Sequence, residues 1–235
     1  MNERAPGAAD RKLLARVGLF NGLDAGPLAA VIQAATVRRL PPGAVLLEQG
    51  DEPRWLYLIV EGRLKIGHMS PDGKPLTLRL LGPGDLVGCA AVFRKLPYPA
   101  TATAVVDARV LVWGAARFED LMDGYPQLAK NALSVVSGRA EEMLRRVQEM
   151  ATEPADQRIA RALLRLVRDA GRPVDAGTEI DFALSRQDLA EFAGATLYTV
   201  SRTLSAWQQA GIVASGRRRV VVCDLPRLTR LAEGR

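Results

Sequence analysis

The sequence predicts an α+β protein: an antiparallel β-roll of the jelly-roll or double-stranded β-helix type, a long helix, and a C-terminal winged helix-turn-helix. Three observations carry this prediction: short β-rich segments between Pro41 and Trp113, a heptad-like apolar repeat after Pro126, and two capped helices with a basic hairpin after Ser185. At 235 residues the chain is long enough for two ordinary domains. We expect the N-terminal helices and roll in 1–126, the long helix in 127–151 and the winged helix in 152–235.

Six segments in the first half have the β-branched and aromatic composition of strands. They are AVLLE, WLYLIV, RLKIGHM, LTLRLL, ATATAVV and RVLVW, and glycine turns such as Gly82–Pro83–Gly84 lie between them. This spacing is typical of an antiparallel sandwich or roll. Before the first of these segments, 11–20 and 24–36 have the apolar spacing of short helices that pack on the roll.

The composition excludes several classes of protein. Two cysteines, Cys89 and Cys223, are too few for a disulfide scaffold or a cysteine zinc site. The N-terminus lacks the apolar segment of a signal peptide, and no run of about 18 uncharged apolar residues occurs, so we expect a soluble, cytoplasmic protein with no membrane partner. One histidine, His68, argues against a cupin-like metalloenzyme, and we expect no catalytic or metal site.

A narrow apolar stripe runs along the predicted long helix. Its members are spaced 3, 4, 3, 4 and 3 residues apart, which is the repeat of a coiled coil. Charged residues surround the stripe, so we expect a second copy of the chain to cover it; packing against the protein's own roll is the alternative. The predicted dimerisation residues are Leu133, Val136, Ala140, Met143, Val147 and Met150.

Pro154 interrupts this helix, because proline disfavours the helical conformation in the residue before it. The next helix is predicted over 155–170. Four arginines share one face of it, and we expect this face to be its solvated side, with phosphate contact as the alternative. They are Arg158, Arg161, Arg165 and Arg168.

Two consecutive helix starts follow. Ser185 and Asp188 form a short variant of the capping box, Gly194 permits a sharp turn, and Thr196 caps the next helix. A helix-turn-helix requires a small residue where its helices cross, a glycine in the turn and a branched residue in the core, and this sequence has all three at the expected spacing. These are Ala190, Gly194 and Val200, with Leu189, Phe192, Leu204 and Trp207 as further apolar positions.

The stretch 192–223 contains no acidic residue, and its IVASGRRRVVVC segment predicts a hairpin with arginines near the tip. Such a surface attracts phosphates, and Arg202 can donate two hydrogen bonds to guanine. The alternatives are a solvated basic surface, an ordinary helical hairpin with a basic turn, or a winged helix that binds protein. The predicted DNA-binding residues are Ser185, Arg186, Gln187, Thr196, Leu197, Tyr198, Thr199, Ser201, Arg202, Arg217 and Arg218.

The two halves together resemble the CRP/FNR family of bacterial transcription regulators over nearly the whole chain. The matching residues are Pro42–Gly43, Gly50–Asp51, Tyr57–Leu58–Ile59, Glu61–Gly62 and Gly84–Asp85 in the roll, and LSRQDLAEFAGATLYTVSRTL in the helix-turn-helix. The resemblance implies a sensor roll, a dimerisation helix and a DNA-binding winged helix. It also implies three partners besides a second copy: double-stranded DNA, RNA polymerase and a small effector.

The chain departs from the cyclic-AMP-binding members of this family. Where they present a glutamate and an arginine with a small hydroxyl residue, this sequence has Cys89 and Pro99–Ala100–Thr101. A cyclic phosphate would lose its charge-assisted hydrogen bonds, so we expect a different effector. The predicted effector pocket comprises Gly88, Cys89, Ala90, Pro99, Ala100 and Thr101.

Other effectors follow from the same resemblance. Two cysteines exclude an iron–sulfur cluster, which needs four. Haem bound through His68 or Cys89 is one hypothesis. The alternatives are that His68 is an ordinary surface residue and that Cys89 is an ordinary buried one. The segment GCAAVFRKLPYPATATA and TLYTVSR resemble regulators that respond to nitric oxide and related nitrogen oxides. Ser201–Arg202 matches the FNR-like branch and implies TTG-like half-site ends, but Tyr198 replaces a common glutamate and leaves the inner base open.

Overall fold

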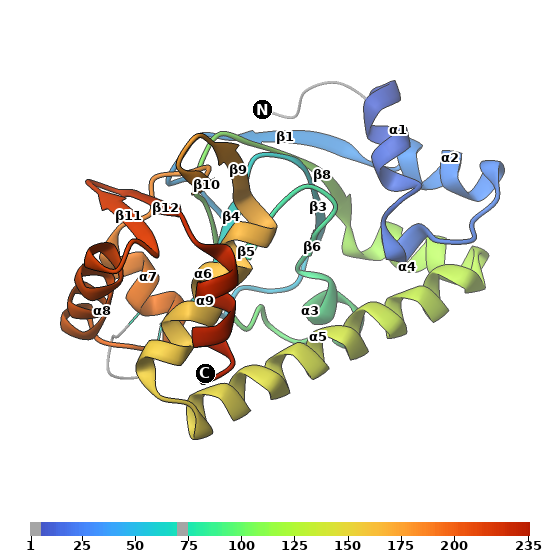
Figure 1. Cartoon of the computed structure of the whole chain (residues 1–235). Coiled ribbons are helices and arrows are strands. Elements are labelled where there is room, and N and C mark those ends of the chain that lie inside the picture. The colour runs from blue at the N-terminus through green and yellow to red at the C-terminus, as the bar shows by residue number, and fades with distance from the viewer. Residues whose placement is uncertain (1–5, 70–74) are drawn as a thin grey trace. The chain divides into compact units, whose positions relative to one another are not determined.

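The computed structural model describes residues 6–69 and 75–235 (Figure 1). It divides into two compact units. One unit is Met1–His68 with Leu81–Met143, and the other is Met69–Leu80 with Leu144–Arg235. The predicted α+β fold class is confirmed: antiparallel sheets form a roll, a long helix follows, and a winged helix-turn-helix ends the chain.

The roll contains two four-stranded sheets. All six predicted strand segments are strands, but two further strands escaped prediction because β1 carries two arginines and β6 has only two residues. The first sheet has the order β1 (Thr36–Leu40), β8 (Ala108–Gly114), β3 (Trp55–Glu61) and β6 (Leu86–Val87). The second has the order β2 (Val45–Leu47), β7 (Thr101–Ala104), β4 (Leu64–Met69) and β5 (Pro75–Leu81).

Two apolar clusters hold the roll together. The inner cluster takes buried residues from both sheets, among them Leu40, Tyr57 and Val110. The outer cluster packs the first sheet against helices, and its Trp113 is fully buried and donates Nε1–H to the carbonyl of Val31 at 2.8 Å. The helices that accompany the roll are α1 (Ala8–Leu14), a 3-10 turn (Gly18–Phe20), α2 (Ala25–Gln33), α3 (Cys89–Arg94) and α4 (Ala115–Gly124).

The long helix α5 spans Pro126–Thr152, one residue longer at each end than the predicted 127–151, and α6 spans Ala155–Ala170, as predicted. Pro126 suits a first helical turn because its missing N–H would have no partner there. Near this end, Leu128 and Ala132 are buried in the outer cluster. Pro154 is the N-cap of α6, so the predicted interruption lies where the proline requires it.

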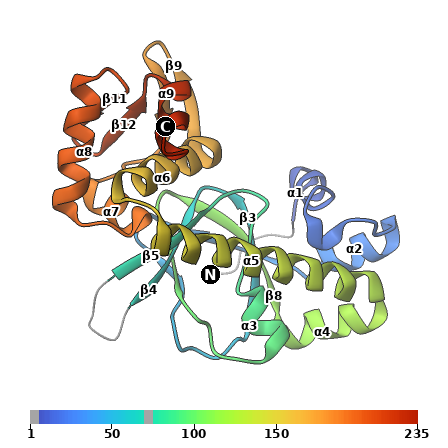
Figure 2. The same cartoon turned by 60° about the horizontal axis from the view of Figure 1, so that its bottom comes forward.

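The C-terminal unit surrounds α6 with a sheet and three helices (Figure 2). Helices α7 (Arg186–Ala193) and α8 (Leu197–Gln209) contact each other, and α8 contacts β11. Sequence reasoning missed β9, β10 and α9. The sheet has the order β11 (Val213–Gly216), β12 (Arg219–Val222), β10 (Gly177–Ile180) and β9 (Gly171–Val174), and α9 is Leu225–Ala232.

Candidate nucleic-acid interface and a pocket in the roll

Helix α7 begins at the predicted cap. Ser185 Oγ accepts a hydrogen bond from the Asp188 N–H at 3.0 Å, and Asp188 Oδ2 accepts one from the Ser185 N–H at 2.9 Å. This reciprocal pair satisfies backbone donors that a helix start leaves open. Arg186 and Gln187 are exposed in the first turn, as a surface for phosphates requires. The buried face of α7 consists of Leu189, Ala190, Phe192 and Ala193.

The turn and cap that follow fix the direction of α8. Gly194 has φ +59° and ψ +42°, a left-handed conformation that glycine adopts without strain. Thr196 Oγ1 then accepts a hydrogen bond from the Thr199 N–H at 3.1 Å and caps α8 as predicted. The apolar spacing is confirmed, since Val200, Leu204 and Trp207 are buried.

The outward face of α8 carries residues that are predicted to contact DNA. Tyr198 is 73% exposed, Leu197 is 48% exposed and Arg202 is exposed. Tyr198 and Arg202 stand one turn apart on one face. Ser201 is half-buried, and the hydroxyl of Thr199 is 2.8 Å from that of Thr196, so Thr199 also serves the cap.

The hairpin of β11 and β12 separates its three arginines into two kinds. Arg219 donates to Glu179 Oε1 at 2.5 Å, and this hydrogen bond holds the pKa of Glu179 below its usual range. Arg217 and Arg218 are exposed at the tip, and Arg218 has φ +57°. Among the described residues no carboxylate pairs with Arg202, Arg217 or Arg218. Their charge is therefore available to a partner.

The expectation of a solvated arginine face on α6 is wrong for three of its four arginines. Arg158 donates to the carbonyls of Glu153 (2.6 Å), Ala193 (3.1 Å) and Gly194 (3.0 Å). Because Ala193 and Gly194 form the turn before α8, Arg158 fixes that turn to the start of α6. Arg161 pairs with Glu153 at 2.9 Å and Arg165 with Glu149 at 2.8 Å, whereas Arg168 is exposed beside Asp169.

The apolar stripe of α5 is largely uncovered. Exposed fractions are 70% for Leu133, 45% for Met143, 57% for Val147 and 46% for Met150, and Ala140 is also exposed. Val136 is half-buried. Leu144, 65% exposed, is an additional member that the predicted spacing missed. Four of these side chains recur at 7, 4 and 3 residues, which is a coiled-coil face: Leu133, Ala140, Leu144 and Val147.

The residues predicted to form an effector pocket are mostly packed in the core of the roll or hydrogen-bonded within it. Cys89 is fully buried in the outer cluster, and Ala100 is buried. Thr101 Oγ1 accepts a hydrogen bond from the Gln49 N–H at 3.1 Å, and the Pro99 carbonyl accepts one from His68 Nδ1 at 3.1 Å. Ala90 is half-buried.

Gly88, the remaining member of that predicted pocket, has φ +80°. A Cβ at this position would lie 2.9 Å from the Trp55 carbonyl oxygen and 3.0 Å from a ring carbon of Tyr98. The first distance is too short for a real side chain, the second is tight, and the positive φ adds strain for any other residue, so the backbone favours glycine here.

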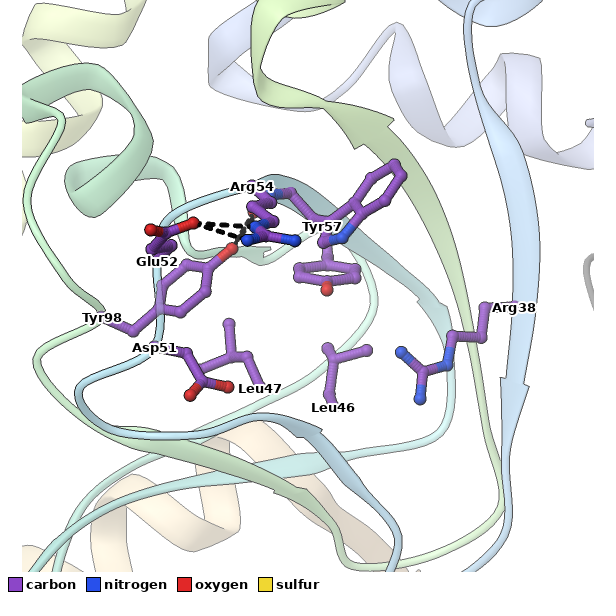
Figure 3. Close-up of a pocket in the computed structure, with 9 residues that line it drawn as sticks. Arg38, Leu46, Leu47, Asp51, Glu52, Arg54, Tyr57 and Tyr98 are labelled. Atoms are coloured by element: carbon purple, nitrogen blue, oxygen red, sulfur yellow. Dashed lines mark hydrogen bonds and ion pairs between the residues drawn. The ribbon is translucent and has the colours of Figure 1, made fainter.

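A pocket of about 430 Å³ lies elsewhere in the roll (Figure 3). None of the six residues predicted to bind an effector lines it, and no motif in the sequence marked its lining residues as a binding site. Its lining combines buried apolar and tyrosine side chains with charged groups: Arg38, Leu46, Leu47, Asp51, Glu52, Arg54, Trp55, Tyr57 and Tyr98.

Among residues 6–69 and 75–235, no group of three or more histidine, cysteine, aspartate or glutamate side chains could hold a metal ion. No helix within those ranges is long and apolar enough to cross a bilayer. Nothing in the structure tests haem binding through His68 or Cys89, which stays a hypothesis.

Together, the capped helix pair, the basic hairpin and the preceding roll define a class of protein: a DNA-binding transcription regulator with a C-terminal winged helix. Comparison with known proteins agrees. Residues 37–125 match the model of the cyclic nucleotide-binding domain, and residues 157–231 match that of the Crp-like helix-turn-helix domain. The chain belongs to the CRP/FNR family of transcription regulators. Regulators of this family bind DNA and act as dimers.

Similar proteins cover nearly the full chain. The cyclic AMP receptor protein of Thermus thermophilus is 30% identical over 92% of this chain and 97% of its own. A CRP-like cAMP-activated global transcriptional regulator of Mycobacterium tuberculosis is 25% identical over 94% of this chain and 99% of its own. The solved structure of FixK2 from Bradyrhizobium japonicum has a TM-score of 0.71 and 25% identity, and covers 84% of this chain and 96% of that one.

Proposed function

We propose that two copies of this chain bind an inverted-repeat DNA site and that Arg202 reads a guanine in each half-site. The observation that carries the proposal is the set of unpaired arginines: Arg202 on α8 and Arg217 and Arg218 on the hairpin are exposed and have no carboxylate partner in the described parts of the chain. Arginine can donate two parallel hydrogen bonds to guanine O6 and N7. Half-sites would lie about 34 Å apart, with TTG-like ends.

The roles of the other predicted residues follow from their positions. Arg217 and Arg218, at a hairpin tip, suit phosphate contact, which positions a protein without reading sequence. Ser185, Arg186 and Gln187 begin α7, where exposed N–H groups and a cation favour a phosphate. Along α8, base edges would meet Leu197, Tyr198, Ser201 and Arg202, while Thr196 and Thr199 hold its start.

The dimer would form along α5. The exposure of the apolar stripe supports this assignment, because contiguous apolar side chains on an otherwise charged helix favour packing against a partner helix. The stripe includes the predicted Leu133, Val136, Ala140, Met143, Val147 and Met150, and we add Leu144.

Leu133→Asp tests this seam against Ser134→Asp, which places the same charge on an exposed neighbour outside the stripe. Light scattering should show a monomer for the first variant and a dimer for the second. If the Leu133→Asp variant were still a dimer, the interface would have to lie on another surface of the protein.

We assign control of DNA binding to a small effector other than cyclic AMP, with nitric oxide or another redox or small-molecule signal as the leading class. The buried Cys89 and the backbone-bonded Pro99 and Thr101 support this, since none supplies a cation for a cyclic phosphate. Response to cyclic AMP is the second candidate, because two similar proteins carry it in their names. The protein would act in the cytoplasm, with RNA polymerase as a further partner.

The decisive experiment selects preferred duplexes from a random pool with the purified dimer and measures binding over a range of salt concentrations. The proposal expects an enriched inverted repeat and a steep negative dependence of log K on log salt, because bound phosphates release counterions. Cyclic AMP is then titrated against the selected duplex. A winged helix that binds protein instead would enrich no sequence and show no salt slope.

A further inference from the structure

We propose that the pocket in the roll binds a small aromatic monocarboxylate, whose carboxylate pairs with Arg38 and whose ring rests on Leu46, Leu47 and the two tyrosines. This inference goes beyond the proposed function. It depends on that function only for the statement that such a ligand would act as an effector.

Arg38 supplies the charge. Strand β1 alternates its side chains, so Arg38 shares a face with Leu40, which lies in the inner cluster, whereas Val37 belongs to the outer one. Its register partner on β8, Val110, is also in the inner cluster. Figure 3 shows the half-buried guanidinium reaching into the pocket from β1.

No carboxylate within the described ranges pairs with this guanidinium. Its neighbour in the pocket is the side chain of Tyr57. Burial raises the pKa of Tyr57 to about 12, so this phenol is neutral at physiological pH and leaves the positive charge of Arg38 unmatched. A half-buried cation without a counter-ion is stabilised by an anionic ligand.

The walls suit a flat apolar body. Leu46, Leu47, Tyr57 and Tyr98 are each less than 8% exposed, and their side chains line one continuous hollow in Figure 3. Tyr98 is held rigidly: its hydroxyl donates to the Trp55 carbonyl at 2.6 Å and accepts from the Trp55 N–H at 3.0 Å. A wall fixed in advance lowers the entropic cost of binding a rigid ring.

The remaining charges limit the ligand to a single negative charge. Arg54 donates to Glu52 at 2.7 and 2.9 Å, so these two groups neutralise each other. Asp51 lines the pocket without an ion-pair partner among the described residues and would repel a second anionic group. A hydroxyl or amino group on the ring would instead donate to Asp51. The pocket volume, about 430 Å³, lies at the small end of ligand sites.

The test uses the full-length protein without DNA and measures heats of binding for 4-hydroxybenzoate and its neutral analogue 4-hydroxybenzamide. The carboxylate should bind about tenfold tighter or better, because a charge-assisted hydrogen bond replaces a neutral one. In Arg38→Gln this preference should fall to about threefold or less. Arg39→Gln, on the other face of the same strand, should keep it.

A second measurement locates the ligand. Saturating 4-hydroxybenzoate should shift the ring signals of Tyr57 and Tyr98 in the wild-type NMR spectrum, which requires no variant to fold. Equal affinities of the two analogues, an unchanged preference in Arg38→Gln, or unmoved tyrosine signals would each overturn the proposal. Because DNA is absent, any of these results leaves the proposed DNA recognition standing.

Discussion

Two groups of arginines in the C-terminal unit have opposite surroundings. The inner arginines, Arg158, Arg161, Arg165 and Arg219, bond to carboxylates or carbonyls of their own chain. The outer arginines, Arg202, Arg217 and Arg218, are exposed and have no carboxylate partner in the described ranges. The residue type is the same, so the count of arginines says little about where phosphates bind.

The difference shows how the unit separates folding from recognition. An arginine whose N–H groups donate to buried carbonyls has its hydrogen-bonding capacity filled and stabilises the fold. An exposed arginine without a carboxylate partner instead gives the surface a positive electrostatic potential, and its N–H groups can donate to a ligand. Removing an inner arginine should therefore act on stability, and removing an outer one on the free energy of DNA binding.

The largest expected effect is on Arg158. Arg158→Ala removes three hydrogen bonds and leaves the carbonyls of Ala193 and Gly194 without this donor, which should lower the free energy of unfolding by about 2 kcal/mol. Urea denaturation measures the loss. Arg158→Lys should recover only part of it, since an ammonium group cannot reproduce the planar fork.

The matched control for this prediction is Arg168→Ala, because the Arg168 side chain is exposed and forms an ion pair with the adjacent Asp169. It should change stability by less than about 0.5 kcal/mol. Equal losses in the two alanine variants would show that the bonds from Arg158 to the turn contribute nothing specific.

Arg202→Ala should cost about 1–3 kcal/mol of DNA-binding free energy and relax preference at one base pair per half-site. Binding to a panel of single-base duplex variants measures both effects. Thermal unfolding should stay close to wild type, because Arg202 is exposed and no carboxylate in the described ranges pairs with it. A uniform loss over all duplexes would make Arg202 a phosphate contact.

The hairpin gives a smaller, sequence-independent effect. Arg217→Ala and Arg218→Asn should each weaken binding to every duplex and reduce the salt slope by about 1. Asparagine is chosen for the second position because Arg218 has φ +57°, which asparagine tolerates better than alanine.

Arg219→Ala is the matched hairpin control, since Arg219 is already neutralised by Glu179. Its salt slope should remain that of the wild type. A slope that falls as far as in Arg217→Ala would remove the distinction between inner and outer arginines.

The helix-turn-helix and α6 of the C-terminal unit could be predicted from local signals, whereas β9, β10 and α9 could not. Caps act within three residues and helical periodicity within one or two turns, so Ser185, Thr196 and the bounds of α6 could be predicted. The partners of Arg158 could not, because Ala193 lies 35 residues away in sequence. Periodicity identifies which residues share a face, but tertiary packing decides what that face meets.

The same limit explains two further misses. The predicted stripe on α5 kept a strict alternation of three and four, whereas a straight helix drifts by about 20° per heptad, so Leu144 lies nearer the exposed face than the spacing suggested. The pocket draws on β1, β2, β3 and the segment near Tyr98, which only strand register brings together. Alternation in TVRRL was the one local sign that Arg38 faces inward.

The smallest expected effect concerns Arg109 in the roll, which, like the inner arginines, bonds to carboxylates of its own chain. It is an effect on how the stability of the fold depends on pH. Arg109 donates to Asp10 at 2.8 and 3.0 Å and to Glu61 at 2.7 Å. Burial of Asp10 opposes its ionised form, but the Arg109 guanidinium, together with the Gly7 N–H that donates to the same carboxylate, outweighs this and holds the pKa of Asp10 below its usual value. The same guanidinium lowers the pKa of Glu61.

Because the folded pKa values are depressed, the stabilisation is complete above the unfolded values of about 4 and disappears as pH falls through the folded ones. Urea midpoints measured from neutral to acidic pH should therefore fall less steeply below about pH 5 in Arg109→Gln than in the wild type, although the variant starts from a lower stability. Arg117→Gln, whose pair with Asp120 is 3.8 Å long and exposed, should follow the wild-type curve. If the Arg109→Gln curve ran parallel to the wild type, pairing with Asp10 and Glu61 would not be the source of the acid sensitivity, and the stability of an internally bonded arginine would have to come from packing of its stem.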